Sequence, residues 1–305
     1  MARVLPDLAR QHILLAASRQ FEEGDVQHWW LPESGAGVRT QISDDTAWLA
    51  YCTAYYVKLT GDTSILDERV SFLKGRQLEQ GEHDAFYVPE ESSHLATLYD
   101  HCVLGLSRNA KSGVHGLPLM GTGDWNDGMN RVGEHGKGES IWLGWFLCST
   151  LTVFEEIATA RRDLARAGQF AARRAELAGA IDRKGWDGAW FRRAYFDDGT
   201  PLGTVAAEEC RIDTIAQSWA ILSGVAAPDK ALTAMANVEA HLIDWTDRIA
   251  QLFDPPFRHH MPDPGYIQGY PPGIRENGGQ YTHGAIWAIF AYAKLGDTEK
   301  AGRLF

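Results

Sequence analysis

Two carboxylates three positions apart, Asp124 and Asp127, flank Trp125 and Asn126 in a segment bracketed by glycines. A carboxylic acid is the usual proton donor for breaking a glycosidic bond, and an indole offers a flat apolar surface to a sugar ring. The segment therefore predicts a sugar-processing site, with an Asx-rich turn as the alternative. A calcium loop is excluded, because the oxygen ligands and the glycine are out of register.

Hydrogen-bonding side chains are dense in the segment from Tyr270 to His283. Five of them fall within nine residues: Arg275, Glu276, Asn277, Gln280 and His283. An arginine and a histidine together favour an oxyanion such as phosphate. We take Arg275, Gln280 and His283 as candidate phosphate ligands, with a solvated turn as the alternative.

Two further segments carry polar groups where helices are expected to start. Arg39, Asp44 and Asp45 suit sugar hydroxyls, which such groups hold by charge-assisted hydrogen bonds. Capping of a helix N-terminus is the alternative for the two carboxylates. Asp213 and Gln217 lie four positions apart and share a helix face, with a cap and a buried amide as the alternative.

The composition is that of a packed globular protein. Of 305 residues, 45% are hydrophobic and 23% charged. The net charge of −11 and the lack of a basic tract argue against a nucleic-acid partner. The four cysteines are far apart, so neither a zinc site nor a disulfide framework is indicated, and no metal is predicted.

The N-terminal segment and the apolar runs favour a cytoplasmic protein. The first residues lack the apolar core of a signal peptide. The most apolar run, 141–154, is shorter than the ~20 residues of a membrane span and is expected to be a buried helix.

Helical periodicity dominates the chain. The pattern predicts helices at 8–21, 48–59, 93–106, 140–160, 164–181, 212–223, 229–242 and 284–295. Alternating patterns are scarce, with short strands expected only near 190–196. Helices separated by elaborate loops indicate an all-α toroid of helical hairpins whose loops build a site at one end. The lack of an interior linker predicts a single domain over 1–305.

In the segments that carry the candidate site residues, the chain resembles the catalytic module of glycoside hydrolase family 94, the inverting β-glycoside phosphorylases. It looks most like the β-1,2-glucan-active members, namely the C-terminal module of cyclic β-1,2-glucan synthases and the β-1,2-oligoglucan phosphorylases. The matching segments are 24–30, 37–40, 43–45, 121–132, 136–146, 210–224 and 263–283. They run in order through nearly the whole chain.

This resemblance implies an (α/α)6 barrel and cleavage of a β-glucosidic bond by inorganic phosphate, giving α-glucose 1-phosphate. Asp127 would be the general acid, with Asp124 in reserve, and His283 would contact phosphate. No cofactor is implied, since phosphate is a co-substrate. By the same resemblance Arg39, Asp45 and Trp125 would line the subsite for the reacting sugar. Further candidates for sugar binding are Asp44, Asn126, Gln217 and Glu276.

Two departures from the family pattern stand out. Leu31, Ala36 and Gln41 occupy positions where related chains commonly carry His, Arg and Arg, which removes two positive charges. The chain also stops at Phe305, where the family continues. We therefore expect a barrel incomplete at its C-terminal end, with an open apolar face, belonging to a larger multi-domain synthase.

Other function classes remain as alternatives. The acidic run 43–47 is similar to a terpene-cyclase motif, but Ile42 stands where a further Asp is expected. A non-catalytic carbohydrate-binding fragment is a second alternative. An inverting hydrolase is a third, with Glu276 as the base that activates water. The expected partners are a β-glucan or oligosaccharide and phosphate; no oligomeric state is predicted.

Overall fold

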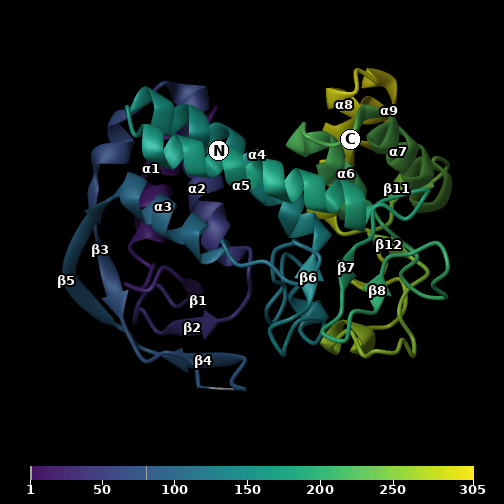
Figure 1. Cartoon of the computed structure of the whole chain (residues 1–305), viewed down its shortest axis with the longest axis horizontal. Coiled ribbons are helices and arrows are strands. Elements are labelled where there is room, and N and C mark those ends of the chain that lie inside the picture. Colours follow the sequence, from purple (N-terminus) through teal and green to yellow (C-terminus); the bar gives the residue numbers. More distant parts are fainter. Residues whose placement is uncertain (1, 80) are drawn as a thin grey trace. The chain divides into compact units, whose positions relative to one another are not determined.

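The computed structural model describes residues 2–79 and 81–305. Their contacts divide the chain into two compact units. Unit 1 is Met1–Lys111 with Val153–Gly168, and unit 2 is Ser112–Thr152 with Gln169–Phe305. Figure 1 labels most of the helices and strands of both units.

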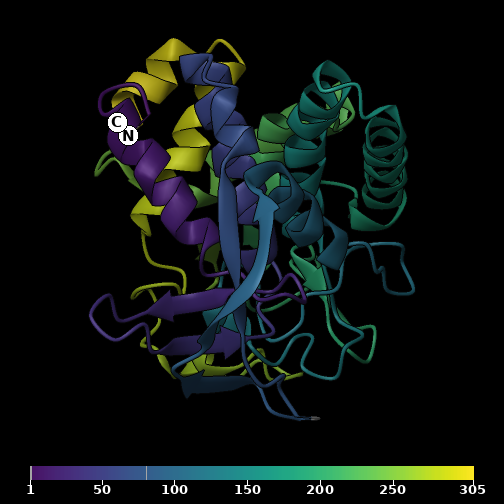
Figure 2. The same cartoon turned by 90° about the vertical axis from the view of Figure 1, so that its left-hand side faces the viewer.

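Unit 1 combines helices with two small antiparallel sheets. Its helices are α1 (Pro6–Ala17), α2 (Asp45–Thr60), α3 (Leu98–Arg108) and the 3₁₀ turn η1 (Ser64–Asp67). Its strands are β1 (Gln27–Trp30), β2 (Gly37–Thr40), β3 (Arg69–Lys74), β4 (Asp84–Tyr87) and β5 (Glu90–Thr97). The sheet order is β1-β2-β4, and β3 pairs with β5 in a separate ribbon, blue in Figure 2.

Unit 2 holds most of the later helices and several short strand pairs. Its helical elements are η2 (Asp127–Met129), η3 (Ile181–Gly185), α6 (Thr214–Ser223), α7 (Pro228–Leu242), η4 (Tyr266–Gly269), α8 (Thr282–Lys294) and α9 (Thr298–Leu304). Its strands are β6 (Glu139–Ser140), β7 (Ala194–Tyr195), β8 (Pro201–Leu202), β9 (Ile212–Asp213), β10 (Ile243–Asp244), β11 (Ile249–Ala250) and β12 (Phe253–Asp254). The first boundary between the units, at Lys111 and Ser112, follows α3, and the other two fall inside α4 (Ile141–Ala160) and α5 (Leu164–Ala180).

Aromatic side chains from three helices form the core of unit 2. Trp142 of α4, Trp219 of α6 and Trp287 of α8 are all buried. Their ring centroids lie 5.3 to 6.2 Å apart, in stacked and edge-on pairs. Such pairs add to the stabilisation from burial alone. This core holds the helices whose ends carry the candidate site.

Helix α4 is the apolar element that the sequence predicts as a buried helix. By length and composition it is apolar enough to cross a membrane, but 72% of its most apolar window is buried inside the protein. A core helix shows this burial, and the prediction for residues 141–154 is confirmed.

The prediction of an all-α chain forming an incomplete (α/α)6 barrel is wrong. Among the described residues, strands form five small sheets alongside the helices, so the chain is mixed α/β. The short strand expected near 190–196 is present as β7, but the other strands escaped prediction, because most are only two to four residues long. The eight-residue β5 is mostly solvent-exposed and lacks apolar alternation. The expected helix 93–106 accordingly begins only at Leu98. A single catalytic module over 1–305 stays a prediction.

Candidate functional site

Asp124 anchors the 121–130 loop of unit 2. Its side chain is fully buried and accepts a bidentate ion pair from Arg193, at 2.7 and 2.6 Å. The Ser140 hydroxyl donates to the same carboxylate at 2.6 Å, and the Asn126 backbone N–H donates at 3.1 Å. Because both oxygens are occupied within the fold, Asp124 is poorly placed to protonate a ligand.

Asp127 has a different environment at the start of the turn η2. Asn126 caps this turn, since its side-chain oxygen accepts the Gly128 N–H at 3.2 Å. The turn also packs against η4, because a Cβ on Gly128 would lie 2.8 Å from Ile267. Asp127 itself is half-buried, so its carboxyl group lies at the edge of the fold.

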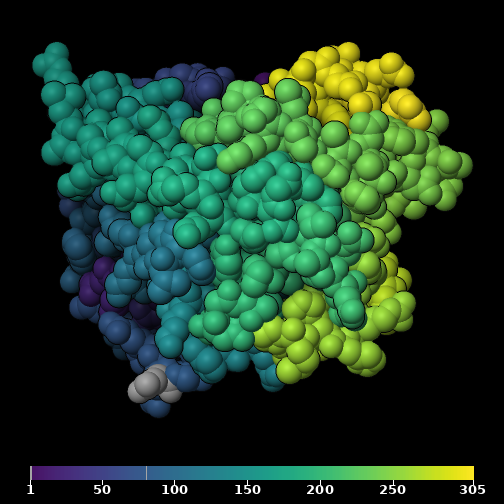
Figure 3. Space-filling model, turned by 45° about the vertical axis from the view of Figure 1, so that its right-hand side comes forward, coloured from purple at the N-terminus to yellow at the C-terminus, as the bar shows by residue number. Residues whose placement is uncertain are grey.

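Two tyrosines interact electrostatically with Asp127. Burial and then the Asp127 charge raise the pKa of Tyr266 to about 12. Burial and then Glu276 raise the pKa of Tyr281, with a smaller effect from Asp127. Both phenols therefore stay protonated near neutral pH and are able to donate hydrogen bonds. The η4 segment, yellow-green in Figure 3, lies at the surface, and Tyr266 is 51% exposed.

Trp125 connects the acidic loop to the start of α8. Its indole N–H donates to Nδ1 of His283 at 3.0 Å, and its ring lies 5.3 Å from Trp287. An indole N–H can only donate, so Nδ1 of His283 is an acceptor and the ring proton lies on Nε2. Partial burial lowers the pKa of His283, which favours the neutral ring.

The other candidate phosphate ligands differ in their surroundings. Arg275 is exposed, stacks on Tyr270 at 4.6 Å and pairs with Glu276 at 3.3 Å. The side-chain oxygen of Gln280 accepts the backbone N–H of Ala250 at 2.8 Å, which ties it to β11. Within the described residues, no group of three or more His, Cys, Asp or Glu side chains is arranged to hold a metal ion.

Gln217 lies in the interior of unit 2. Its amide exchanges hydrogen bonds with the backbone of Phe191, both at 2.8 Å, and donates to the Asp213 carbonyl at 2.9 Å. These contacts fit the buried-amide interpretation, and we give Gln217 no substrate role.

Arg39, in unit 1, is committed to its own fold. It is 2% exposed and donates to Asp25 at 2.6 and 2.8 Å and to Glu23 at 3.0 Å. Its remaining donors reach the carbonyls of Gly75 and Arg76. All its N–H groups are thus engaged, and none is left for a sugar hydroxyl in this arrangement.

The neighbouring carboxylates of unit 1 are also bound. Both oxygens of Asp45 lie 3.0 Å from Nδ1 of His28, and Thr40 donates to it at 3.3 Å. Asp44 accepts the indole N–H of Trp48 at 2.7 Å. Asp44 is the residue before α2, but its side chain makes no capping hydrogen bond. The alternative that Asp44 caps this helix is therefore not supported.

The three positions that depart from the family pattern lie near β1 and β2. Leu31 is 45% exposed and its N–H donates to the carbonyl of Ala36, which closes the β1–β2 hairpin. Gln41 is exposed and donates to the carbonyl of Glu82. Leu31, Ala36 and Gln41 thus take part in hydrogen bonds within unit 1, where the family pattern would place charged side chains.

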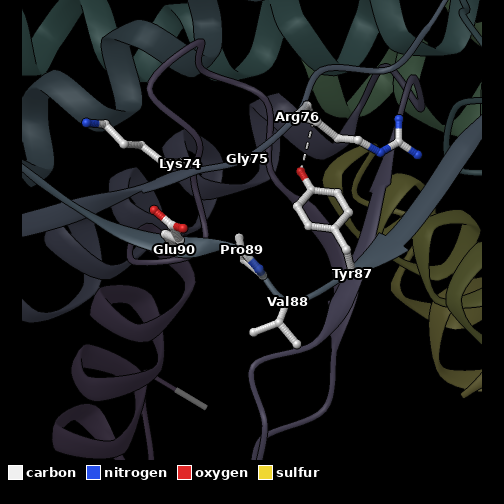
Figure 4. A pocket seen from close by; sticks show the side chains of 7 residues that line it. All are labelled: Lys74, Gly75, Arg76, Tyr87, Val88, Pro89 and Glu90. Atoms are coloured by element: carbon white, nitrogen blue, oxygen red, sulfur yellow. Dashed lines mark hydrogen bonds between the residues drawn. The ribbon is translucent and has the colours of Figure 1, made fainter.

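A shallow pocket of about 410 Å³ lies in unit 1 beside the backbone that Arg39 holds. Residues 74–76 and 87–90 line it, and Tyr87 donates to the carbonyl of Arg76 at 3.0 Å. Figure 4 shows Lys74 and Arg76 pointing to opposite sides, and Arg76 already pairs with Glu82. Since the two cations do not converge, we do not place the phosphate site there.

Comparison with known proteins settles the family. The model of the glycosyl hydrolase 94 superfamily catalytic domain matches residues 1–305. The chain belongs to the glycosyl hydrolase 94 superfamily. The resemblance inferred from the sequence motifs is thereby confirmed.

Curated relatives of this family 94 chain include a synthase and several phosphorylases. Cyclic β-(1,2)-glucan synthase NdvB of Rhizobium meliloti is 52% identical over 98% of this chain and 11% of its own length. Two Paenibacillus borealis enzymes are each 31% identical: 3-O-β-D-glucopyranosyl-β-D-glucuronide phosphorylase, over 95% of this chain, and solabiose phosphorylase, over 97%. The chain spans 36% of either phosphorylase. Family 94 phosphorylases are enzymes of the glycosyltransferase class.

Solved structures give a likeness of fold alone. A rhamnosidase from Klebsiella oxytoca with rhamnose bound matches 97% of this chain and 43% of its own, with a TM-score of 0.53 and 14% identity. A GH78 family rhamnosidase of Bacillus sp. GL1 matches 86% of this chain and 20% of its own, with a TM-score of 0.50 and 15% identity.

Motif reasoning on this family 94 chain missed the residues that surround the two aspartates. Tyr266 and Tyr281 interact with Asp127, and neither was named as a candidate although both fall within the matching segment 263–283. Arg193 binds Asp124 from 69 positions away, and nothing in the chain distinguishes it from the adjacent Arg192. Only the fold reveals such long-range partners.

Proposed function

We propose that this chain cleaves β-glucosidic bonds with inorganic phosphate and inversion, releasing α-glucose 1-phosphate. A phosphate oxygen attacks the anomeric carbon as the glycosidic C–O bond breaks, and the bond's electron pair leaves with the glycosidic oxygen. Asp127 gives its proton to that oxygen. Phosphate is itself a nucleophile, so no second carboxylate has to activate water.

The hydrogen bond between Trp125 and His283 carries this proposal. It joins the loop of the proposed acid to the proposed phosphate ligand at 3.0 Å. A neutral His283 ring with its proton on Nε2 is suited to donate to a phosphate oxygen. The Trp125 indole provides an apolar surface for the sugar beside Asp127.

The proposed substrate is a β-1,2-glucan, in keeping with the 52% identical relative, which is a cyclic β-(1,2)-glucan synthase. We further propose that the chain works as part of a larger, cytoplasmic synthase, since it matches only 11% of that relative's length. Glu276, Arg275 and Tyr281 are proposed to bind the sugar or orient phosphate next to Asp127.

The test is release of glucose 1-phosphate from short β-1,2-glucans with and without inorganic phosphate. Replacement of Asp127 by Asn removes the proton donor and is expected to lower kcat by roughly 10²–10⁴-fold. Asp229→Asn, a change of the same type on the exposed first turn of α7, is expected to leave the rate unchanged.

Other outcomes would point to other functions. Release of free glucose without phosphate would instead favour an inverting hydrolase, with Glu276 as the base. Glucan binding without turnover by the wild-type chain would favour a non-catalytic carbohydrate-binding role.

A further inference from the structure

Arg193 is a fully buried guanidinium between two carboxylates of unit 2. It forms the bidentate pair with Asp124, and its Nε lies 3.3 Å from Asp213. Burial opposes its charge, but the two carboxylates more than compensate and raise its pKa. A buried charge is stable only when it is paired in this way, so Arg193 is a permanent cation at a fixed place.

A small sheet fixes the backbone of Arg193. Ser140 of β6 pairs with Ala194 of β7, which places Arg193 beside the Ser140 hydroxyl. The Arg193 N–H donates to the carbonyl of Leu202 at 2.8 Å. Gly203, at φ 82°, allows this approach, because a Cβ there would lie 2.6 Å from the Arg193 nitrogen. The guanidinium therefore extends from a rigid base.

A chain of hydrogen bonds runs from Arg193 to the turn that carries Asp127. Arg193 holds the Asp124 carboxylate, and one oxygen of that carboxylate accepts the Asn126 N–H. The Asn126 side chain in turn accepts the Gly128 N–H. Asp127 lies between the last two residues of this chain, so its position depends on Asp124 staying in place.

We propose that Arg193 is a positioning residue for the general acid: through Asp124, it holds the loop so that the Asp127 carboxyl group meets the glycosidic oxygen. This inference rests on the proposed function. Arg193 does not touch substrate, and the proton comes from Asp127. The two carboxylates of the motif thus have separate tasks, since Asp124 anchors the loop and Asp127 donates the proton.

The test compares two substrates with different leaving groups. Arg193→Lys keeps the positive charge but cannot form the two parallel hydrogen bonds that the guanidinium makes to Asp124. On β-1,2-glucan, kcat is expected to fall about 100-fold with little change in KM, because the acid is displaced. A nitrophenyl β-glucoside releases nitrophenolate, a leaving group that needs no proton. With this substrate and phosphate, kcat of Arg193→Lys is therefore expected to fall by no more than about fivefold. Asp127→Asn is expected to show the same contrast.

A double variant, Arg193→Lys with Asp127→Asn, is expected to be no slower than Asp127→Asn alone, since the two residues act as one unit. Equal losses on both substrates, or additive losses in the double variant, would overturn the positioning role. Arg192→Lys is the matched control. Arg192 binds Asp187 and nearby carbonyls, and its replacement is expected to leave the ratio between substrates unchanged.

Two further measurements keep the test decisive. If Arg193→Lys does not fold, Ser140→Ala serves instead, because it removes one donor to Asp124 while leaving the ion pair. Its kcat is expected to fall about tenfold on β-1,2-glucan and much less on the nitrophenyl β-glucoside.

If the wild-type chain releases no glucose 1-phosphate, the proposed function fails, and NMR titration of His283 tests the positioning separately. Displacement of Trp125 exposes His283 and raises its pKa in Arg193→Lys, whereas an unchanged pKa would contradict the inference.

Discussion

At the scale of single residues, what surrounds a carboxylate decides its role. Asp124 accepts hydrogen bonds from a guanidinium, a hydroxyl and a backbone N–H, which together hold it as a buried anion. Asp127 lies at the edge of the fold beside two protonated tyrosines. A proton donor must reach both solvent and substrate, and of the two carboxylates only Asp127 lies where it can do so.

His283 is the residue whose titration we expect to limit the reaction at low pH. Its pKa lies below the usual value of about 6.5, so the ring is neutral at pH 7. As the pH falls through that lowered pKa, Nδ1 gains a proton and can no longer accept from Trp125. We expect kcat/KM for phosphate to fall in this range, and the stability of the fold to fall with it, because the unfolded chain binds the proton more readily.

Replacement of His283 by Gln checks this expectation. Glutamine does not titrate, so the acid limb of the phosphate profile should disappear, while KM for phosphate at pH 7 rises roughly tenfold from the loss of one hydrogen bond. His12→Gln, on the exposed face of α1, should retain the wild-type profile. A profile in His283→Gln identical to that of the wild type would show that another group titrates.

Sequence motifs predicted which segments carry the candidate site but not the partners of its residues. The acidic loop and the Trp125–His283 contact join two segments that the motifs had singled out separately. The assignment of Arg39 to the sugar rested on its motif alone. In the fold its donors reach Gly75 and Arg76, 36 and 37 positions away, and no local pattern announces such contacts.

At the scale of elements, the turn η4 supports the loop of the proposed acid. Gly265 precedes η4 at φ 120°, and a Cβ there would lie 2.1 Å from the Asn130 side-chain oxygen and 2.7 Å from the Gly128 carbonyl. We expect Gly265→Ala to lower the free energy of unfolding by about 1–3 kcal/mol, because alanine is strained in this conformation. The displaced turn is also expected to lower kcat.

Gly269→Ala, at the other end of η4, provides the comparison. Its φ is not positive, and a Cβ at this position meets none of the described atoms within 4 Å. Thermal unfolding and glucan phosphorolysis of the two variants are measured side by side. Equal effects on stability and rate would mean that the contact between η4 and the acidic loop is unimportant.

At this scale most helices were predictable, whereas among the strands only β7 falls in a segment where a strand was expected. Apolar periodicity located α4, α5, α6, α7 and α8 to within a few residues, and Gly61 ends α2 with the left-handed conformation expected of a C-cap. The strands are short, and β5 exposes most of its residues to solvent. A strand with little buried surface leaves no alternating signal, because its pairing depends on backbone hydrogen bonds that any sequence can make.

At the scale of the whole molecule, composition correctly indicated a packed core. The abundant tryptophans serve this core as well as the site. Trp142, Trp219 and Trp287 form the centre of unit 2, and Trp125 lies 5.3 Å from Trp287 at its edge. The sugar-facing surface proposed here is therefore the outer end of a continuous aromatic cluster, which limits how far Trp125 can move.

The cysteines give a direct measure of this packing. Cys102, Cys148 and Cys210 are buried, and Cys52 is exposed. Desolvation raises the pKa of Cys102 and Cys148 to about 12 and that of Cys52 to about 11, so the reactive thiolate form is scarce at all three, and it is the exposure of Cys52 that distinguishes it. We expect Cys52 to react first with a thiol reagent in the native protein, and the buried three only on unfolding.

The rate at which the three buried thiols react then reports how often each region opens. Cys148 lies in α4, fully buried against α5, where its thiol contacts the carbonyl of Arg174, and it should be protected as long as these helices stay packed. The Cys52→Ser variant isolates these slow thiols. If Cys148 and Cys210 react in native buffer as fast as in denaturant, the packing around α4 and β9 is not closed, and a site that depends on fixed positions for Arg193 and Trp125 could not be maintained.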